Sequence, residues 1–344
     1  MSVLNIGIIG AGRIGKVHAE SISRFVSDAR IKSIADPLID QKGIEWAKSI
    51  GISNVYKDYK EILNDENIDI VLICSPTDTH SQISIEAITK GKHVFCEKPV
   101  DHDVERIKAV VDALSVNSHI KYQVGFNRRF DHNFMATKSI VEAGKIGDLN
   151  ILKITSRDPA APPVSYIKVS GGIFLDMTIH DFDMVRFISD AEALEVYATG
   201  GVLVDKAIGE AGDVDTAVVT IKLSNGAIAV IDNCRRATYG YDQRIEAFGS
   251  LGQVSISNDT DSSAVISNAS GVTAEKPKLF FLERYTEAYV REISSFIESV
   301  RTNSAVSVGI IDGLKPVLIG LAAKMSLIEN RPVKLLEIEQ KYGL

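Results

Sequence analysis

The sequence has few cysteines, and their spacing does not pair them. Cys74, Cys96 and Cys234 form an odd set without a Cys-x-x-Cys motif. Such a set supplies neither a disulfide framework nor a zinc knuckle, and it suits a reducing compartment. We therefore expect a cytoplasmic protein that holds no metal.

The sequence also lacks long apolar runs and an excess of basic charge. No stretch approaches the roughly 18 apolar residues that cross a bilayer, and the N-terminus enters a strand-like run without a signal-peptide pattern. The 38 Lys and Arg residues are outnumbered by 45 Asp and Glu, whereas nucleic-acid binding requires clustered basic side chains. We expect neither a membrane nor a nucleic-acid partner.

What the sequence does contain is enough apolar material for two cores. Its 344 residues are 45% hydrophobic and include only 9 prolines. A chain of this length and composition folds nearly throughout and divides into two domains.

The first 125 residues alternate apolar runs of strand length with amphipathic runs of helix length. This alternation predicts βαβ units and a parallel sheet. The apolar runs are unbroken, as expected where helices cover both sheet faces. We therefore expect a doubly wound domain over residues 1–125, with strands at 6–9, 31–35, 70–74, 93–96 and 121–124.

Residues 126–344 follow a different pattern, which predicts an α+β domain with a large, open and mainly antiparallel sheet. A helix-like stretch ends near Gly144, and Ser224, Asn225 and Gly226 form a hairpin signal between two strand-like runs. Two amphipathic helices, near 285–301 and 309–329, are expected to pack back on the junction between the domains. Strands are expected at 149–156, 195–199, 214–223, 227–234, 245–248 and 253–256.

A glycine-rich motif directly follows the first strand and precedes a helix. In it, Gly10, Gly12 and Gly15 enclose Arg13 and Ile14. The first glycine permits a tight turn, the second allows a pyrophosphate to approach the backbone, and the third lets helix and strand pack closely. These residues are expected to bind a dinucleotide. The alternative is a turn that uses glycines for geometry alone.

Asp36 ends the second strand, where a carboxylate can accept hydrogen bonds from both hydroxyls of an adenosine ribose. A 2′-phosphate would meet a like charge there, and Pro37 replaces any arginine that could hold it. The pattern favours NAD over NADP. A solvated turn aspartate is the alternative for Asp36, and methyltransferases also combine a glycine-rich loop with an acid at this place.

Two further loops follow strands and are expected at the carboxyl edge of the parallel sheet, where ligands of open α/β sheets bind. Ser75, Thr77 and His80 follow the third strand and are expected to line the nicotinamide ribose and phosphates. Glu97 and Lys98 follow the next strand and are also assigned to the cofactor site. A loop leading into a helix cap is the alternative for the first group.

Asp176, His180 and Asp183 lie at spacings of i, i+4 and i+7 in a stretch that is otherwise mainly apolar. The spacing places them on one face of a predicted helix. A polar stripe on a largely buried helix must be paired or must line a cleft. The alternative is a core histidine held by Asp176.

These residues suit the oxidation of an alcohol, which needs a base for the hydroxyl proton and a cation for the developing alkoxide. His180 fits the base, Lys98 fits the cation, and Asp176 would orient both. An exposed turn lysine is the alternative for Lys98.

The motifs resemble, in order and spacing, those of the glucose-fructose oxidoreductase and inositol dehydrogenase family. The resemblance implies a Rossmann domain, an open antiparallel sheet used for oligomerisation, often as a tetramer, and a Lys-Asp-His catalytic set at Lys98, Asp176 and His180. It covers nearly the whole chain and rests on residues 10–15, 35–37, 97–99, 125–131 and 171–183.

The inositol branch of that family implies further substrate contacts. These fall on Arg128 and on either Tyr239 or Tyr241. The stretch that contains Arg157 and Asp158 also looks like one that borders the substrate cleft in inositol dehydrogenases, although the residues alone predict only a rigid loop.

The sequence therefore predicts an NAD-dependent enzyme that oxidises a secondary hydroxyl of a cyclic polyol, most simply myo-inositol to 2-keto-inositol. A dehydrogenase of another inositol isomer or sugar, or a deoxysugar ketoreductase, is the alternative within the fold. A non-catalytic NAD sensor and a methyltransferase are the alternatives outside dehydrogenase chemistry.

Overall fold

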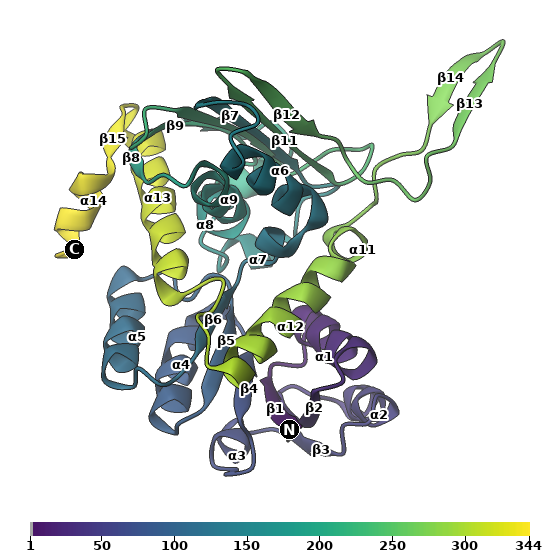
Figure 1. Cartoon of the computed structure of the whole chain (residues 1–344), viewed down its shortest axis with the longest axis vertical. Helices are drawn as coiled ribbons and strands as arrows, with labels where there is room; N and C mark the ends of the chain where they lie inside the picture. The colour runs from purple at the N-terminus through teal and green to yellow at the C-terminus, as the bar shows by residue number, and fades with distance from the viewer. Residues whose placement is uncertain (1–2) are drawn as a thin grey trace. The chain divides into compact units, whose positions relative to one another are not determined.

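The chain divides into two compact units in a computed structural model that describes residues 3–344 (Figure 1). The first unit extends to Phe130 and also includes Glu287–Lys315, and the second comprises Asp131–Thr286 and Pro316–Leu344. The predicted division after residue 125 differs in two ways. The first unit keeps the residues up to Phe130, and it takes up a later segment that includes most of helix α12 (Thr286–Thr302).

The first unit is built on six parallel strands in the order β3-β2-β1-β4-β5-β6. All five strands expected from the apolar runs are present. The sequence analysis missed only β3, a three-residue edge strand. The strands are β1 (Leu4–Ile9), β2 (Ala29–Ala35), β3 (Asn54–Tyr56), β4 (Ile70–Ile73), β5 (His93–Glu97) and β6 (Tyr122–Gly125).

Helix α12 belongs to this unit because its apolar side supplies part of the core. Ile293, Phe296 and Ile297 recur at the spacing of one helix face and are buried with Ile8 of β1 and Ile22 of helix α1. The other helices of the unit are α1 (Arg13–Phe25), α2 (Gln41–Ser49), α3 (Lys60–Leu63), α4 (His80–Thr89) and α5 (Val104–Val116), with short 3-10 turns η1 (Thr77–Thr79) and η2 (Asn127–Phe130).

The second unit contains a seven-stranded sheet in the order β12-β11-β7-β10-β9-β8-β15. Strands β7 and β10 run parallel, and the other neighbouring pairs in this sheet are antiparallel. The expected mainly antiparallel sheet is confirmed. Its strands are β7 (Leu149–Arg157), β8 (Ala193–Gly201), β9 (Thr216–Leu223), β10 (Ile228–Cys234), β11 (Asp242–Gly249), β12 (Gly252–Ile256) and β15 (Val333–Lys334).

The two faces of this sheet differ in their surroundings. Helices α6 and α9 pack together on one face, which we call the inner face. Along β9, Val219 and Ile221 point inward and are buried, whereas the intervening Val218 is 41% exposed on the outer face. The helices of the unit are α6 (His132–Glu142), α7 (Val164–Ile167), α8 (Ile173–Asp176), α9 (Ile179–Ser189), α10 (Lys206–Glu210), α11 (Phe281–Arg284), α13 (Ile310–Glu329, from Pro316 onward) and α14 (Leu335–Lys341).

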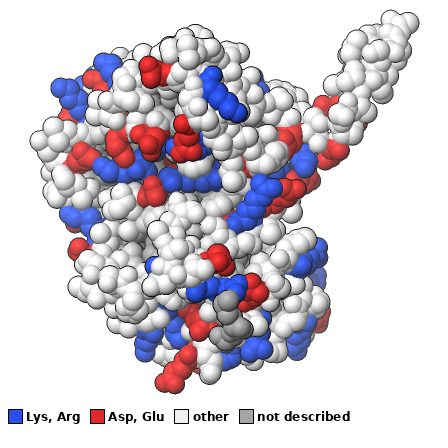
Figure 2. All heavy atoms as spheres, in the orientation of Figure 1, with Lys and Arg blue, Asp and Glu red and all other residues white. Residues whose placement is uncertain are grey.

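A separate hairpin of β13 (Val265–Asn268) and β14 (Gly271–Ala274) projects away from the seven-stranded sheet (Figure 1). All residues of the two strands are exposed. Its outer part shows no charged side chains (Figure 2). This hairpin was not among the predicted elements.

Over the described part of the chain, none of the helices has the length and apolar composition needed to span a membrane.

Candidate active site

The three glycines of the loop after β1 are required for different structural reasons. Gly10 has a φ of 103°, and a Cβ atom there would lie 2.5 Å from the carbonyl of Cys74. A Cβ atom on Gly15 would lie 2.0 Å from the oxygen of Gly10. The fold itself thus requires these two glycines, whereas a Cβ atom on Gly12 would meet open space.

Gly12 is also the N-cap of α1, and it offers no side chain to cap the first amides of the helix. Arg13 and Ile14 form the first turn. The exposed backbone and the positive end of the helix dipole fit a pyrophosphate, which can approach closely only where no side chain intervenes.

Asp36 lies beside this loop at the end of β2. Its Oδ2 accepts a hydrogen bond from the Ala11 amide at 2.8 Å, and its Oδ1 accepts one from the Leu38 amide at 2.8 Å. The carboxylate is partly exposed. Each oxygen keeps a lone pair, so the side chain is fixed in place while it can still accept bonds from ribose hydroxyls.

The loop after β4 presents Ser75 and Thr77, which are half-buried at the carboxyl edge of the parallel sheet. The hydroxyls of Ser75 and Thr79 lie 2.7 Å apart, and Thr79 also donates to the Pro76 carbonyl. His80 has a different environment. It is only 2% exposed and both of its ring nitrogens contact backbone carbonyls. Its ring has no nitrogen left for the cofactor, in contrast to the sequence prediction.

Glu97 and Lys98 end β5 at the same edge. Glu97 is buried and its Oε1 lies 2.6 Å from Nε2 of His18 on α1, while its Oε2 accepts a bond from the Lys98 amide. A Cβ atom on Gly125 would approach Oε2 to 3.0 Å. Glu97 thus ties α1 to the segment that carries Lys98. The Lys98 side chain is half-buried, and a cis peptide joins it to Pro99.

The predicted helix around Asp176 is in fact two helices. Asp176 is the last residue of α8, and His180 is the second residue of α9. The Thr178 amide and hydroxyl both donate to the Ile173 carbonyl, which tightens the chain between the helices. Asp176 and His180 remain half-buried, whereas Asp183 has no exposed surface. The predicted continuous polar stripe is therefore replaced by two polar residues at a helix junction.

A buried arginine holds the Asp176 carboxylate. Both Nη atoms of Arg235 lie 3.2 Å from Asp176 Oδ2, and the Tyr166 hydroxyl donates to Oδ1 at 2.8 Å. Arg235 is only 1% exposed and also lies 3.9 Å from the carboxylate of Asp213. Asp213 in turn accepts a bond from the Ile173 amide. These contacts orient Asp176 from two sides.

A second polar cluster fixes the start of α9 to the inner face of the sheet. Asp181 accepts hydrogen bonds from Ser156 at 2.6 Å and from the Asn233 amide nitrogen at 2.8 Å. The Thr178 hydroxyl lies 2.6 Å from the Asn233 amide oxygen. All four side chains are buried. The network anchors the residues on both sides of His180.

The structure does not bring Arg157 and Tyr239 to this face. Both lie at the outer face of the sheet, where Arg157 pairs with Asp232 at 2.6 Å and contacts the Tyr239 hydroxyl at 3.3 Å. That hydroxyl donates to Asp242 at 2.5 Å. Arg157, Asp232 and Tyr239 line an open hollow of about 370 Å³. This set is separate from Asp176 and His180.

Tyr241 has a different setting from Tyr239. It is buried and packs edge to face against Tyr285, with ring centroids 6.0 Å apart. Asp158 follows β7 and is half-buried, with its backbone fixed by Cys234 and Ala237.

Arg128 lies in the first unit, in η2 just after β6. It is 3% exposed, and the neighbouring Arg129 pairs with Asp312 at 3.0 Å. Arg128 thus follows a strand at the same sheet edge as the glycine loop and Lys98.

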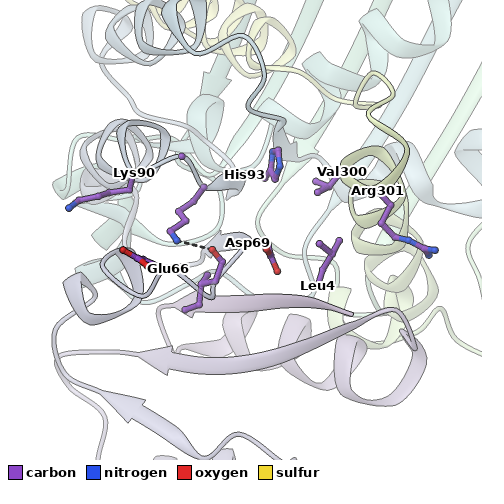
Figure 3. Close-up of a pocket in the computed structure, with 10 residues that line it drawn as sticks. Leu4, Glu66, Asp69, Lys90, His93, Val300 and Arg301 are labelled. Carbon is purple, nitrogen blue, oxygen red and sulfur yellow. Dashed lines mark hydrogen bonds between the residues drawn. The ribbon is translucent and has the colours of Figure 1, made fainter. Parts of the chain in front are cut away.

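A larger hollow of the first unit, of about 650 Å³, lies at the opposite edge of the parallel sheet (Figure 3). Leu4, Asp69 and His93 line it where β1, β4 and β5 begin. The Lys92 ammonium donates to the carbonyls of Asp65 and Ile68, and burial lowers its pKa. This hollow does not belong to the edge that carries the glycine loop.

Comparisons with known proteins cover both units. The family model described as an oxidoreductase family with an NAD-binding Rossmann fold matches residues 4–126, and the model of the GFO/IDH/MocA C-terminal domain matches residues 134–255. The chain is 48% identical to the myo-inositol 2-dehydrogenase of Thermotoga maritima, over 97% of this chain and 99% of that protein. This chain belongs to the GFO/IDH/MocA oxidoreductase family. It is an NAD-dependent oxidoreductase, as the sequence predicted, and not a methyltransferase.

Two solved structures of the family extend the comparison. The myo-inositol dehydrogenase of Corynebacterium glutamicum is 39% identical, with a TM-score of 0.92 over 97% of this chain and 99% of that one. The scyllo-inositol dehydrogenase of Lactobacillus casei, determined with NAD(H) and scyllo-inositol, is 31% identical, with a TM-score of 0.90 over 97% of this chain and 100% of that one.

Arg235, the partner of Asp176 in this GFO/IDH/MocA chain, was not among the residues predicted for the site. The sequence does carry a signal for it, because Ala229, Ile231 and Asn233 point inward at a period of two along β10. The same alternation places Arg235 on the inner side. An inward arginine requires an acidic partner.

We expect Asp36→Ser to weaken NAD binding and to narrow the preference over NADP, because the substitution removes both a ribose acceptor and the charge that repels a 2′-phosphate. The ratio of kcat/KM for the two cofactors measures the effect. The control is Asp40→Ser, which removes an exposed carboxylate but keeps a capping residue at the start of α2. Equal use of NAD and NADP by the unmodified chain would contradict this role of Asp36.

Proposed function

We propose that this enzyme oxidises one secondary hydroxyl of a cyclic polyol, converting myo-inositol to 2-keto-inositol. The main support for this type of reaction is a pair of half-buried polar residues at the α8–α9 junction, Asp176 and His180. The names of the Thermotoga maritima and Corynebacterium glutamicum relatives support the substrate.

NAD, when bound, accepts the hydride from the carbinol carbon. The fit of the first unit to this cofactor rests on the open space at Gly12, the uncapped amides of α1 and the fixed carboxylate of Asp36. We propose that Gly10, Gly15, Arg13, Ile14, Ser75, Thr77, Glu97 and Lys98 complete the cofactor site.

His180 is the proposed base that takes the hydroxyl proton. An imidazole titrates near neutrality and can accept a proton at the rate that the reaction requires. The proposed role of Lys98 is to place an ammonium beside the same oxygen and to stabilise its developing negative charge. Asp176, which Arg235 and Tyr166 hold from two sides, would orient His180 and the substrate.

We keep Arg128, Asp158 and Tyr241 as proposed substrate contacts. Arg157 and Tyr239 are occupied there by Asp232 and by Asp242. We therefore choose Tyr241 from the tyrosine pair as the substrate contact.

Comparison of isomers tests the substrate assignment. The kcat/KM values for myo-inositol, scyllo-inositol and glucose are measured by NADH formation, and the product is identified by NMR. We expect myo-inositol to give the highest value and a ketone at carbon 2. A higher value for scyllo-inositol or for a hexose would replace myo-inositol while retaining the dehydrogenase chemistry.

We also propose that the chain forms a homo-oligomer, a tetramer as the family resemblance implies, through the outer face of its seven-stranded sheet. On that face Ile151 lies opposite both Ile228 of β10 and Phe248 of β11, and each of the three is more than 40% exposed. A contiguous apolar patch on a folded domain is typical of a contact surface. Sedimentation of the purified chain measures the assembly.

We propose the cytoplasm as the site of action. Cys74, Cys96 and Cys234 are free thiols in the structure. Free thiols persist in a reducing compartment.

A further inference from the structure

His80 has an unusual pair of contacts at the start of α4. Its Nε2 lies 2.7 Å from the carbonyl oxygen of Ser75, and its Nδ1 lies 2.8 Å from the carbonyl oxygen of Pro99. The residue is only 2% exposed. One ring therefore bridges two loops that both follow strands at the carboxyl edge of the parallel sheet.

The chemistry of the two partners sets the protonation state of the ring. A backbone carbonyl oxygen can only accept a hydrogen bond, and a neutral imidazole has a single N–H group. A neutral His80 would therefore direct one nitrogen lone pair at a carbonyl oxygen. Both contacts are hydrogen bonds only when both nitrogens carry a proton, that is, when the ring is an imidazolium.

The surroundings agree with this reading. Burial alone lowers the pKa of His80, but the contact with the Cys96 sulfur and the two carbonyl bonds outweigh it and raise the pKa to about 9. Cys96 itself donates to the Glu97 carbonyl. Tyr122 of β6 shares a hydrogen bond with Ser84, which lies on the same helix, α4, as His80. Burial raises the pKa of Tyr122 well above its ordinary value, so this phenol stays neutral.

Two acids on the neighbouring segments are engaged elsewhere. Asp101, two residues beyond Pro99, accepts a bond of 2.6 Å from Ser81 and lies 3.8 Å from Arg106, and Glu97 lies 2.6 Å from His18. The proton on His80 is thus held by the two loop carbonyls.

We propose that His80 is a positioning residue whose imidazolium ties the Ser75 loop to the Pro99 carbonyl and thereby fixes the backbone that presents Lys98. The part that concerns Lys98 rests on the proposed function, whereas the protonation state does not. The positive charge is buried within the first unit and acts through the two backbone carbonyls.

The protonation state is measured directly by NMR of the unmodified protein labelled with 15N at histidine. His80→Asn identifies the His80 signals, and His119→Asn, at an exposed loop position, is the matched control. We expect both His80 nitrogens to carry protons at pH 8 and the ring to lose one proton near pH 9. A single N–H group at pH 8 would overturn the proposal, and this result does not depend on which substrate is oxidised.

The positioning role is measured by separating turnover from cofactor binding. We expect His80→Asn to lower kcat roughly tenfold while the Kd for NADH stays nearly unchanged, because the loss of the bridge displaces Lys98 without removing a cofactor contact. The rate at which acetic anhydride labels Lys98, read by mass spectrometry against exposed Lys90, should change several-fold. Unchanged labelling of Lys98 would assign His80 a purely structural role, even if no polyol proves to be a substrate.

Discussion

His180→Ala should lose about 10²–10⁴-fold in turnover with a polyol while NADH binding survives. The proposed base is removed, but the contacts that fix α9 remain, since they run through Thr178, Asp181 and Asn233. The measurement is kcat and KM for the polyol, together with NADH titration by fluorescence.

The control for His180 is His119→Ala, which removes an exposed imidazole from the first unit. We expect this control to keep parental kinetics. Turnover of His180→Ala within a few-fold of the parent would show that His180 is a structural residue. Circular dichroism establishes that both variants are folded, so a loss of activity can be assigned to chemistry.

Lys98→Met should lose at least about a hundredfold in turnover, because a preorganised charge beside a developing oxyanion typically contributes roughly 10²–10³-fold in rate. Methionine keeps most of the side-chain length and the apolar stem but has no ammonium. The Glu97–His18 pair, which fixes the adjacent backbone, is unaffected. NADH binding should therefore remain close to that of the parent.

Lys90→Met is the matched control for Lys98, because Lys90 is an exposed lysine at the hollow on the opposite sheet edge (Figure 3). Arginine at position 98 is a poorer probe, since its planar group does not replace a compact ammonium. If Lys98→Met retained near-parental kcat, Lys98 would be a solvated turn residue.

The sequence was sufficient for the cofactor half of the fold. Unbroken apolar strands, a glycine motif between strand and helix, and an acid at the end of β2 each have one dominant structural explanation. Strand β3 was missed because its three residues are too short for a periodic signal. Helix α12 belongs to the first unit because Phe296 is buried in the core of that unit. The periodicity of the sequence predicts an apolar helix face, but it does not say against which core that face packs.

The candidate site was less accessible to sequence reasoning, because its details depend on tertiary partners. The spacing of Asp176 and His180 predicted one helix face, but the Thr178 bond to Ile173 divides the helix. A histidine at position 80 could have been a ligand contact, but its ring bonds two backbone carbonyls instead. One belongs to Pro99, 19 residues away, and the other to Ser75, whose position depends on the loop conformation, so the sequence predicted neither. The register between β7 and β10 places Arg157 on the outer face of the sheet, and the sequence alone does not give that register.

The central claim is that this chain transfers a hydride from a polyol to NAD, and steady-state NADH formation with myo-inositol tests it most directly. The account predicts NAD reduction that saturates with myo-inositol, requires NAD in preference to NADP, and falls at least about a hundredfold in both Lys98→Met and His180→Ala. If the folded protein binds NADH but reduces no NAD above background with any inositol isomer or hexose, the dehydrogenase account is contradicted and a non-catalytic NAD sensor replaces it.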